Sequence, residues 1–144
     1  MRRCFSRKAL CDAIASPALM PVLTNVSRHT ILADQAQLAT RPLTRMVGLL
    51  NRRMFQGGQA LIFPRCSAIH TCFMRFPIDV VFLKGGTVIR LIAPLKSFRL
   101  AWALGADTVV ELPAGTLEQG VVQPGDRLDW SGNVGGRQSG VRSQ

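Results

Sequence analysis

Side chains that could do chemistry are concentrated in one segment of the sequence, CSAIHTCFMRFPID, which runs from Cys66 to Asp79. His70 and Cys72 stand two residues apart, so an extended strand would project both side chains from the same face. A thiol beside an imidazole could act as a nucleophile with its base, and the same pair could contribute two ligands to zinc. The spacing provides no third ligand and no residue that would orient the base. We therefore expect neither a resident metal nor a cofactor.

The first carboxylate of interest is Asp79, which follows Pro77 at the entrance to the apolar run VVFL. A carboxylate in such a place commonly accepts backbone N–H groups of a neighbouring turn. We expect Asp79 to fix the turn over residues 74–77 in this way. A role as a general acid or base is the alternative, but no second carboxylate is placed beside it by spacing.

The second carboxylate, Glu111, lies inside the apolar run VVEL, where an unpaired charge would be costly. It therefore needs a partner or faces a cavity, and Arg45 and Arg75 are the candidate cations. We expect a pocket with His70 on one wall and Glu111 on the other. Its occupant would be a small polar or anionic ligand or a protein partner.

Two other functions are compatible with the same residues. A hydrolase-type enzyme could combine His70 with Asp79, Glu111 or Cys72. Weak binding of nucleic acid could come from the basic N-terminal third. The ligand-binding module is the favoured interpretation, and whether any reaction is catalysed stays open.

The length and charge of the chain fit one globular domain. The chain has 144 residues, 47% of them hydrophobic, and a formal net charge of +10. Residues 1–54 carry nine Lys and Arg against two acidic residues, whereas residues 55–130 carry seven against six. The domain is thus almost neutral, and its Phe and Trp lie in apolar runs, which argues against a nucleic-acid surface there. No apolar run approaches the ~20 residues of a membrane-spanning helix.

The four cysteines favour a reducing compartment. If the segment from Cys66 to Cys72 is extended, its ends lie about 20 Å apart, whereas a disulfide tolerates less than about 7 Å between α-carbons. We therefore expect free thiols and a cytoplasmic protein. Secretion is the minor alternative, because the start is basic but Asp12 and Pro17 interrupt the apolar stretch that a signal peptide needs.

The elements that must position these residues are mostly strands. Residues 78–93 form two β-branched runs around Gly85-Gly86, the pattern of a tight hairpin buried on both faces. Further strands are expected over residues 60–63, 107–112 and 127–130, with one or two more within residues 29–39. These short strands with Gly and Pro turns predict a mainly β fold, a compact antiparallel barrel or sandwich with one or two short helices.

The remaining motifs concern turns, helices and boundaries. Residues 116–119 read as a capping box that starts a single helical turn, and a helix begins near Pro42 with Gly48 on its polar side. We expect a loose basic extension over residues 1–26, one β-rich domain over 27–130 and a disordered tail over 131–144. Turn and packing positions are Met74, Pro77, Pro113, Gly115, Gly125 and Asp126; Phe73, Phe76, Trp102 and Trp130 are expected in the core or pocket wall.

Three stretches together resemble a known family. LTRMVGLLNRR, IHTCFMRFPIDVVFL and VVELPAGTLEQGVVQPGDRL occur in this order and resemble the bacterial and archaeal family called domain of unknown function 192, over about residues 27–130. The resemblance implies a small β-rich single-domain protein and no known reaction. Many members have Trp-Met-Lys-Asn-Thr before the Pro-x-Asp, whereas this chain has the shorter Phe73-Met74-Arg75-Phe76.

Overall fold

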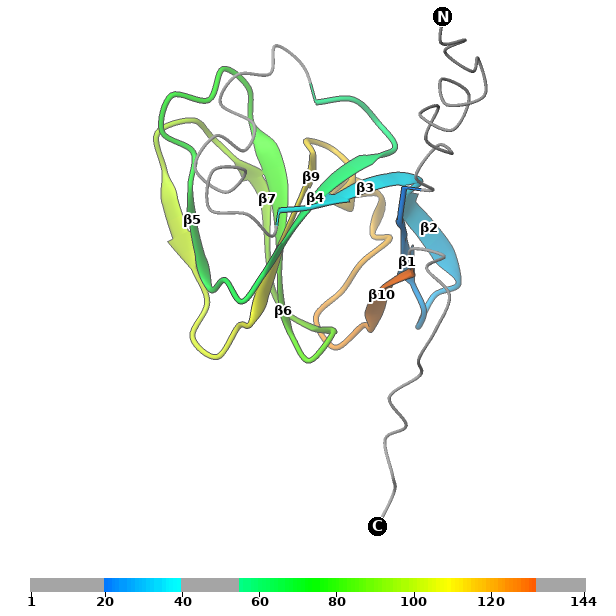
Figure 1. Cartoon of the computed structure of the whole chain (residues 1–144). Coiled ribbons are helices and arrows are strands. Elements are labelled where there is room, and N and C mark those ends of the chain that lie inside the picture. The colour runs from blue at the N-terminus through cyan, green and yellow to red at the C-terminus, as the bar shows by residue number, and fades with distance from the viewer. Residues whose placement is uncertain (1–19, 40–54, 132–144) are drawn as a thin grey trace, which may run out of the picture.

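The computed structural model describes residues 20–39 and 55–131, and these form a layered, mainly β structure (Figure 1). No part of it closes into a barrel, so of the two predicted architectures the sandwich is confirmed. The elements within the described ranges are β1 (Val22–Asn25), β2 (Thr30–Ala33), β3 (Gln35–Leu38), β4 (Gln59–Pro64), β5 (Ala68–His70), β6 (Ile78–Lys84), β7 (Thr87–Leu95), β8 (Leu100–Trp102), β9 (Thr108–Pro113), the 3₁₀ helix η2 (Leu117–Gln119) and β10 (Leu128–Ser131).

The central layer is a five-stranded sheet in the order β3-β4-β9-β6-β7. The β3–β4 pair is parallel and the other pairs are antiparallel. All six residues of β9, and all of β6 except its last residue, are buried. Strands that are apolar on both faces need a covering layer on each side, and this chain provides two smaller sheets for that purpose.

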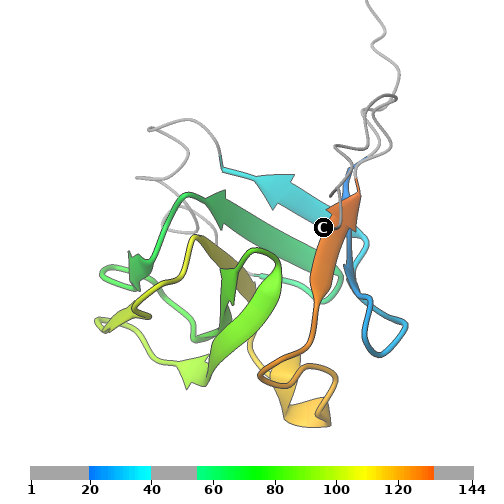
Figure 2. The same ribbon diagram turned by 90° about the horizontal axis from the view of Figure 1, so that it is seen from below.

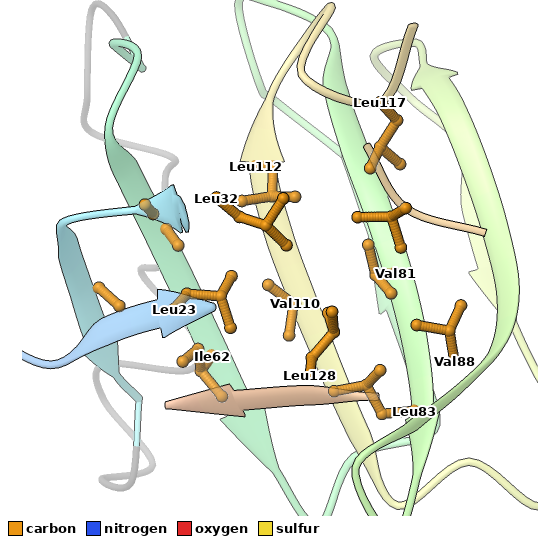
Figure 3. Packing of buried hydrophobic residues seen from close by; sticks show 14 residues of the cluster. Leu23, Leu32, Ile62, Val81, Leu83, Val88, Val110, Leu112, Leu117 and Leu128 are labelled. Atoms are coloured by element: carbon orange, nitrogen blue, oxygen red, sulfur yellow. The ribbon is translucent and has the colours of Figure 1, made fainter. Parts of the chain in front are cut away.

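The sheet β10-β1-β2 covers one face of the central sheet. Leu23 of β1 and Leu128 of β10 pack there against Val81 and Val110, within a cluster that also holds Leu112 of β9 (Figure 3). β1 pairs along its whole length with β10. The sheet begins at Val22, so the last residues of the predicted loose extension over residues 1–26 form a strand that pairs with β10.

The opposite face of the central sheet is covered by the two-stranded ribbon β5–β8 and by the loop that follows β5. Ile69 and Ala101 face inward from the ribbon, and Met74 does so from the loop. They pack against Val80 and Val109, which lie on the other side of the sheet from Val81 and Val110. Figures 1 and 2 place the ribbon and β10 on opposite sides of the central sheet.

The predicted hairpin is confirmed as β6 and β7, joined by Gly85-Gly86. Its predicted burial on both faces holds for β6 but is wrong for β7, which lies at the edge of the sheet and is mostly half-buried or exposed. Both glycines have positive φ, at 56° and 83°. This conformation matches the right-handed twist of the strands and disfavours residues with a side chain. A Cβ on Gly86 would also lie 3.3 Å from the backbone oxygen of Leu128. The turn thus needs glycine for both its backbone angle and its contact with β10.

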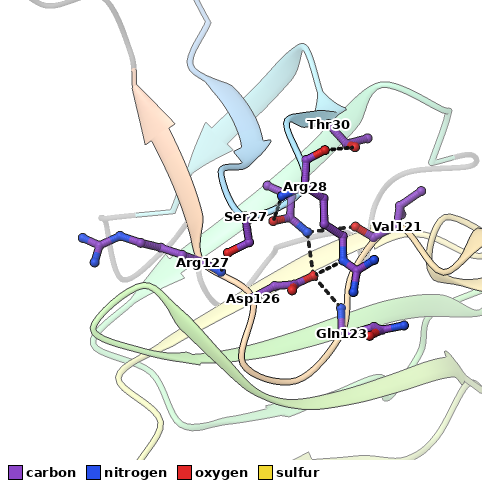
Figure 4. A network of polar contacts seen from close by, with 8 residues as sticks. Ser27, Arg28, Thr30, Val121, Gln123, Asp126 and Arg127 are labelled. Carbon is purple, nitrogen blue, oxygen red and sulfur yellow. Dashed lines mark hydrogen bonds and ion pairs between the residues drawn. The ribbon is translucent and has the colours of Figure 1, made fainter.

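The turn before β10 is tied to β1 by a polar network at Asp126 (Figure 4). Asp126 Oδ2 accepts hydrogen bonds from Asn25 Nδ2 at 2.8 Å, Arg28 Nε at 2.6 Å and the Gln123 amide at 2.9 Å. The bond from Asn25, and then those from Arg28 and Gln123, keep the pKa of Asp126 below its usual value. Gly125, at φ 93°, allows the turn that the sequence predicted.

Candidate functional site

Glu111 lies in the middle of β9, between β4 and β6. Its cross-strand neighbours are Leu61 and Val80, so its side chain shares the face of the sheet that carries Val109 and the ribbon cluster. Only 5% of the residue is exposed. The sequence prediction of an embedded carboxyl group is therefore confirmed.

The electrostatic state of Glu111 follows from this burial. No hydrogen bond or ion pair reaches its carboxyl group from the residues that the structure describes. Burial alone raises its pKa from 4.5 to about 8, so the group is mostly protonated at neutral pH. A protonated carboxyl group offers one donor and an acceptor oxygen inside an apolar surrounding.

Asp79 lies on the opposite face of the central sheet from Glu111. It pairs with Leu112 in β9, one position along from the Val80–Glu111 pair, so the two carboxyl groups project in opposite directions. Asp79 is fully buried, and its Oδ2 accepts a hydrogen bond of 2.8 Å from the Leu117 amide. The predicted contact to the turn over residues 74–77 is therefore wrong: the partner lies 38 residues away in η2.

The sequence predicted that Thr116 caps the helical turn over residues 116–119, but the Asp79 carboxylate accepts the hydrogen bond from this turn instead. Thr116 makes no side-chain cap, and its Oγ1 instead donates to the Pro113 oxygen at 2.7 Å. Burial raises the pKa of Asp79, the amides of Leu117, Gly115 and Thr116 lower it, and the charge of Glu118 raises it. Oδ1 has no hydrogen-bond partner within the described ranges. Asp79 thus holds the loop after β9 in place.

Asp79→Ala is expected to destabilise the protein by about 1–2 kcal/mol, because the Leu117 amide loses its acceptor. Asp79→Asn should cost less, since an amide oxygen can accept the same bond. Urea unfolding measures both changes. The matched control is Asp129→Ala, which removes an exposed carboxylate of β10. Equal stability of Asp79→Ala and the control would show that the cap contributes nothing.

His70 lies on the outer face of the ribbon. It pairs with Leu100 of β8 and is exposed, while its neighbours Ile69 and Thr71 point inward. Within the described part of the chain no hydrogen bond joins it to Asp79, Glu111 or Cys72. The sequence prediction of a shared pocket required the imidazole to lie in the buried cluster around Glu111. The structure places it outside that cluster.

The two cysteines of this segment, Cys66 and Cys72, are free and half-buried, as expected. Among the described residues no three His, Cys, Asp or Glu side chains are grouped closely enough to hold a metal ion. No helix of this part is long and apolar enough to cross a membrane.

The loop after β5 carries Met74, Arg75 and Pro77. Met74 is buried on the ribbon side of the central sheet, and the half-buried Phe76 packs there with Phe55 at 6.4 Å between ring centroids. Arg75, between them, is exposed. Two other predicted residues, Arg45 and Gly48, lie outside the described residues.

The sequence interpretation missed an exposed apolar surface. Phe73 is 75% exposed and Trp102 is 54% exposed, so the expectation that both line the core or a pocket is wrong. In β8 the small Ala101 points inward and the large Leu100 and Trp102 point outward. Small and large apolar residues alternate over residues 100–104, and this alternation could have indicated a strand whose large apolar residues face outward.

Known proteins share this fold and sequence. A crystal structure of a protein of unknown function from Novosphingobium aromaticivorans superposes with a TM-score of 0.65 at 21% identity, over 76% of this chain and 84% of the other. A Sinorhizobium meliloti protein described as a proposed transcription regulator superposes with a TM-score of 0.67 at 26% identity, over 78% of this chain and 92% of the other. These two likenesses support the fold.

Sequence relatives identify the family. A UPF0127 protein of Pyrococcus furiosus is 31% identical in an alignment of 116 residues that covers 76% of this chain and 97% of that protein. The family model of DUF192, described as Uncharacterized ACR, COG1430, matches residues 23–130. The resemblance seen in the sequence motifs is thus confirmed, and the chain belongs to the DUF192 family, whose function is uncharacterised.

Proposed function

We propose that this protein is a small-ligand binding module and that Glu111 is the polar group of its binding site. The observation that carries the proposal is a carboxyl group that is 5% exposed and has no partner among the described residues. Buried polar groups are almost always hydrogen-bonded, and the described residues provide no partner for this carboxyl group, which favours a bound ligand as that partner.

The chemistry of Glu111 narrows the class of ligand. Its surroundings are apolar, with Leu61, Val80 and Val109 on the same face. A protonated carboxyl group can share its proton with a carboxylate or pair with a carboxamide. The proposed ligand is therefore a small molecule with an apolar body and one carboxylate or carboxamide group.

Other residues complete the proposal. Arg75 is a candidate cation at the rim, because its neighbours Met74 and Phe76 pack on the same side of the sheet as Glu111. Arg45 stays a second candidate from the sequence, whereas His70 faces outward. The free thiols of Cys66 and Cys72 fit the cytoplasmic location that we propose.

Ligand binding is better supported than catalysis by this geometry. Asp79 and Glu111 project from opposite faces of the central sheet, and His70 is bonded to neither. A nucleophile–base contact is thus missing from the described residues. Nucleic-acid binding rests on the basic residues 1–54, and Arg28 is the one Lys or Arg of that range among those described. The Sinorhizobium protein is described as a proposed transcription regulator, and this description adds no residue to such a site.

A thermal-shift screen of small carboxylic acids and carboxamides tests the proposal. A true ligand at about 100 times its Kd stabilises the protein by about 2.7 kcal/mol. Glu111→Leu should abolish this stabilisation, whereas Glu111→Gln should keep it, because an amide can still donate to the ligand. For a carboxylate ligand, wild-type affinity should fall above about pH 8, where Glu111 ionises and repels it, and Glu111→Gln should show no such fall.

The matched control is Glu118→Gln, which neutralises an exposed glutamate in η2. It should respond to the compounds as the wild type does. Binding that survives Glu111→Leu unchanged would refute a site at Glu111. A panel that stabilises no variant at millimolar concentration would refute the proposed ligand class.

A further inference from the structure

Five large apolar side chains are exposed on the β5–β8 ribbon and its adjoining loops, and we call this set the ribbon face. The side chains come from β8 and from the loops at its ends and after β5. Their exposed fractions are 75% for Phe73, 65% for Phe98, 63% for Leu100, 54% for Trp102 and 92% for Leu104. Exposed apolar patches of this kind on a soluble domain mark interaction surfaces.

The backbone under the ribbon face is held firmly. Thr71, which is fully buried, donates from Oγ1 to the Lys96 oxygen at 2.6 Å and accepts from the Arg99 amide at 2.9 Å. The Phe98 amide donates to the Thr71 oxygen at 3.0 Å. Arg90 reaches from β7 to the Trp102 oxygen at 2.5 Å. The side chains are thus presented by a fixed scaffold.

Two of the aromatic residues adopt an unfavourable backbone conformation. Phe73 has φ 63° and Phe98 has φ 57°, in the left-handed region that bulky side chains rarely occupy. Their rings contact each other edge to face, with centroids 5.8 Å apart, while both stay exposed. Strained positions of this kind cluster at binding surfaces, where they hold a side chain in place for a partner.

The charges around the ribbon face are mostly positive. Residues 64–107 contain six Lys and Arg and two acidic residues, the buried Asp79 and the exposed Asp107. Arg75 stands in the loop of Phe73, and Lys96 and Arg99 flank Phe98; all three are exposed. The partner of this surface must therefore carry negative charge and accept apolar side chains.

We propose that the ribbon face docks on the surface of a lipid bilayer that contains anionic lipids. Phe73, Phe98 and Leu104 lie in turns or bends rather than in a flat strand, so they protrude. A deformable bilayer accepts protruding side chains without a matching pocket, and apolar burial together with attraction to anionic lipids drives such binding. Tryptophan side chains favour the region of the lipid headgroups, and Trp102 would lie in that region of the bilayer.

Other occupants fit less well. A second copy would bring the same cations together, and like charges repel across an interface. Single-stranded nucleic acid needs open aromatic faces for stacking, but the Phe73 and Phe98 rings contact each other and Leu100 and Leu104 offer no π surface. This inference is independent of the ligand proposed at Glu111, which lies on the inner side of the ribbon.

The test uses Trp102 as a reporter. The chain has two tryptophans, and Trp130 packs against the other core, so the full-length Trp130→Phe variant leaves Trp102 as the sole source of indole fluorescence. Vesicles of phosphatidylcholine with about one quarter phosphatidylglycerol should shift its emission to the blue, and acyl-brominated lipids should quench it. Pure phosphatidylcholine vesicles should have a much weaker effect.

Two variants test the two driving forces in the Trp130→Phe background. Leu104→Asp should reduce the vesicle partition coefficient at least about tenfold, because an inserted leucine is lost and a negative charge is added. Lys96→Glu with Arg99→Glu should do the same through charge. Matched controls on other surfaces are Ile31→Asp in β2, where Ile31 is 65% exposed, and Arg127→Glu, and both should bind nearly as the parent does.

Three results would overturn the inference. The first is no binding to the anionic vesicles at low salt. The second is vesicle binding without quenching of Trp102, which would assign the contact to another basic part of the chain. The third is quenching of Trp102 by a single-stranded oligonucleotide or an acidic peptide when vesicles leave it unchanged, which would assign the ribbon face to that partner.

Discussion

Glu111→Gln is expected to remove most of a pH-dependent loss of stability that the wild-type protein shows between pH 4.5 and about 8. Burial raises the pKa of Glu111 across this window, so the folded protein keeps a proton that the unfolded chain releases. The contribution of Glu111 to the free energy of unfolding is therefore highest below pH 4.5, falls as the pH rises, and levels off above about pH 8. The change from Glu111 is at most about 5 kcal/mol.

The measurement is urea unfolding of both proteins at several pH values between about 5 and about 9. Other titrating groups, including the two histidines, are present in both proteins and cancel in the difference. Asp129→Asn, which changes an exposed carboxylate of β10, should keep the wild-type profile. Parallel profiles for the wild type and Glu111→Gln would mean that the Glu111 carboxyl group is solvated or paired.

Asn25→Asp is expected to destabilise the protein by about 3 kcal/mol or more at neutral pH. Asn25 is fully buried, and its Nδ2 donates to Asp126 Oδ2 at 2.8 Å and to the Val121 oxygen at 2.9 Å. The substitution replaces this donor by a carboxylate that faces Asp126. Arg28, whose Nε already binds Asp126 Oδ2 at 2.6 Å, cannot neutralise both charges.

Chemical unfolding at neutral and acidic pH checks this expectation. Protonation of one carboxylate should restore part of the loss, because the repulsion then disappears. Exchanging the two groups, as Asn25→Asp with Asp126→Asn, should also recover part of it, although the Val121 oxygen still lacks its donor. If the single variant unfolded at the wild-type denaturant concentration, the network would not hold β1 to the turn before β10.

The local features of the fold were predictable from sequence because neighbouring residues determine them. The Gly85-Gly86 turn and the strands beside it depend on backbone preferences and on the alternation of apolar residues within a few positions. The burial of Glu111 followed from its apolar neighbours in β9. The turn, its two strands and the burial of Glu111 are thus each determined by residues within the same short segment of sequence.

The contacts that sequence could not provide join distant segments. The sequence could not show on which side of the ribbon His70 lies, because only the pairing of β5 with β8 and their packing show that its side chain faces outward. Asp79 was expected to bind its own turn, whereas its partner is Leu117. Arg45 and Gly48 stay predictions, because they lie outside the described residues.

The pairing of β1 with β10 has a consequence for synthesis on the ribosome. β1 is translated about a hundred residues before its partner, as the separation of 101 between Asn25 and Asp126 shows. Until β10 emerges, Val81 and Val110 lack the cover of Leu128, and this side of the nascent sheet stays open to chaperones and to other chains. Folding of this layer is therefore completed only after β10 has been translated.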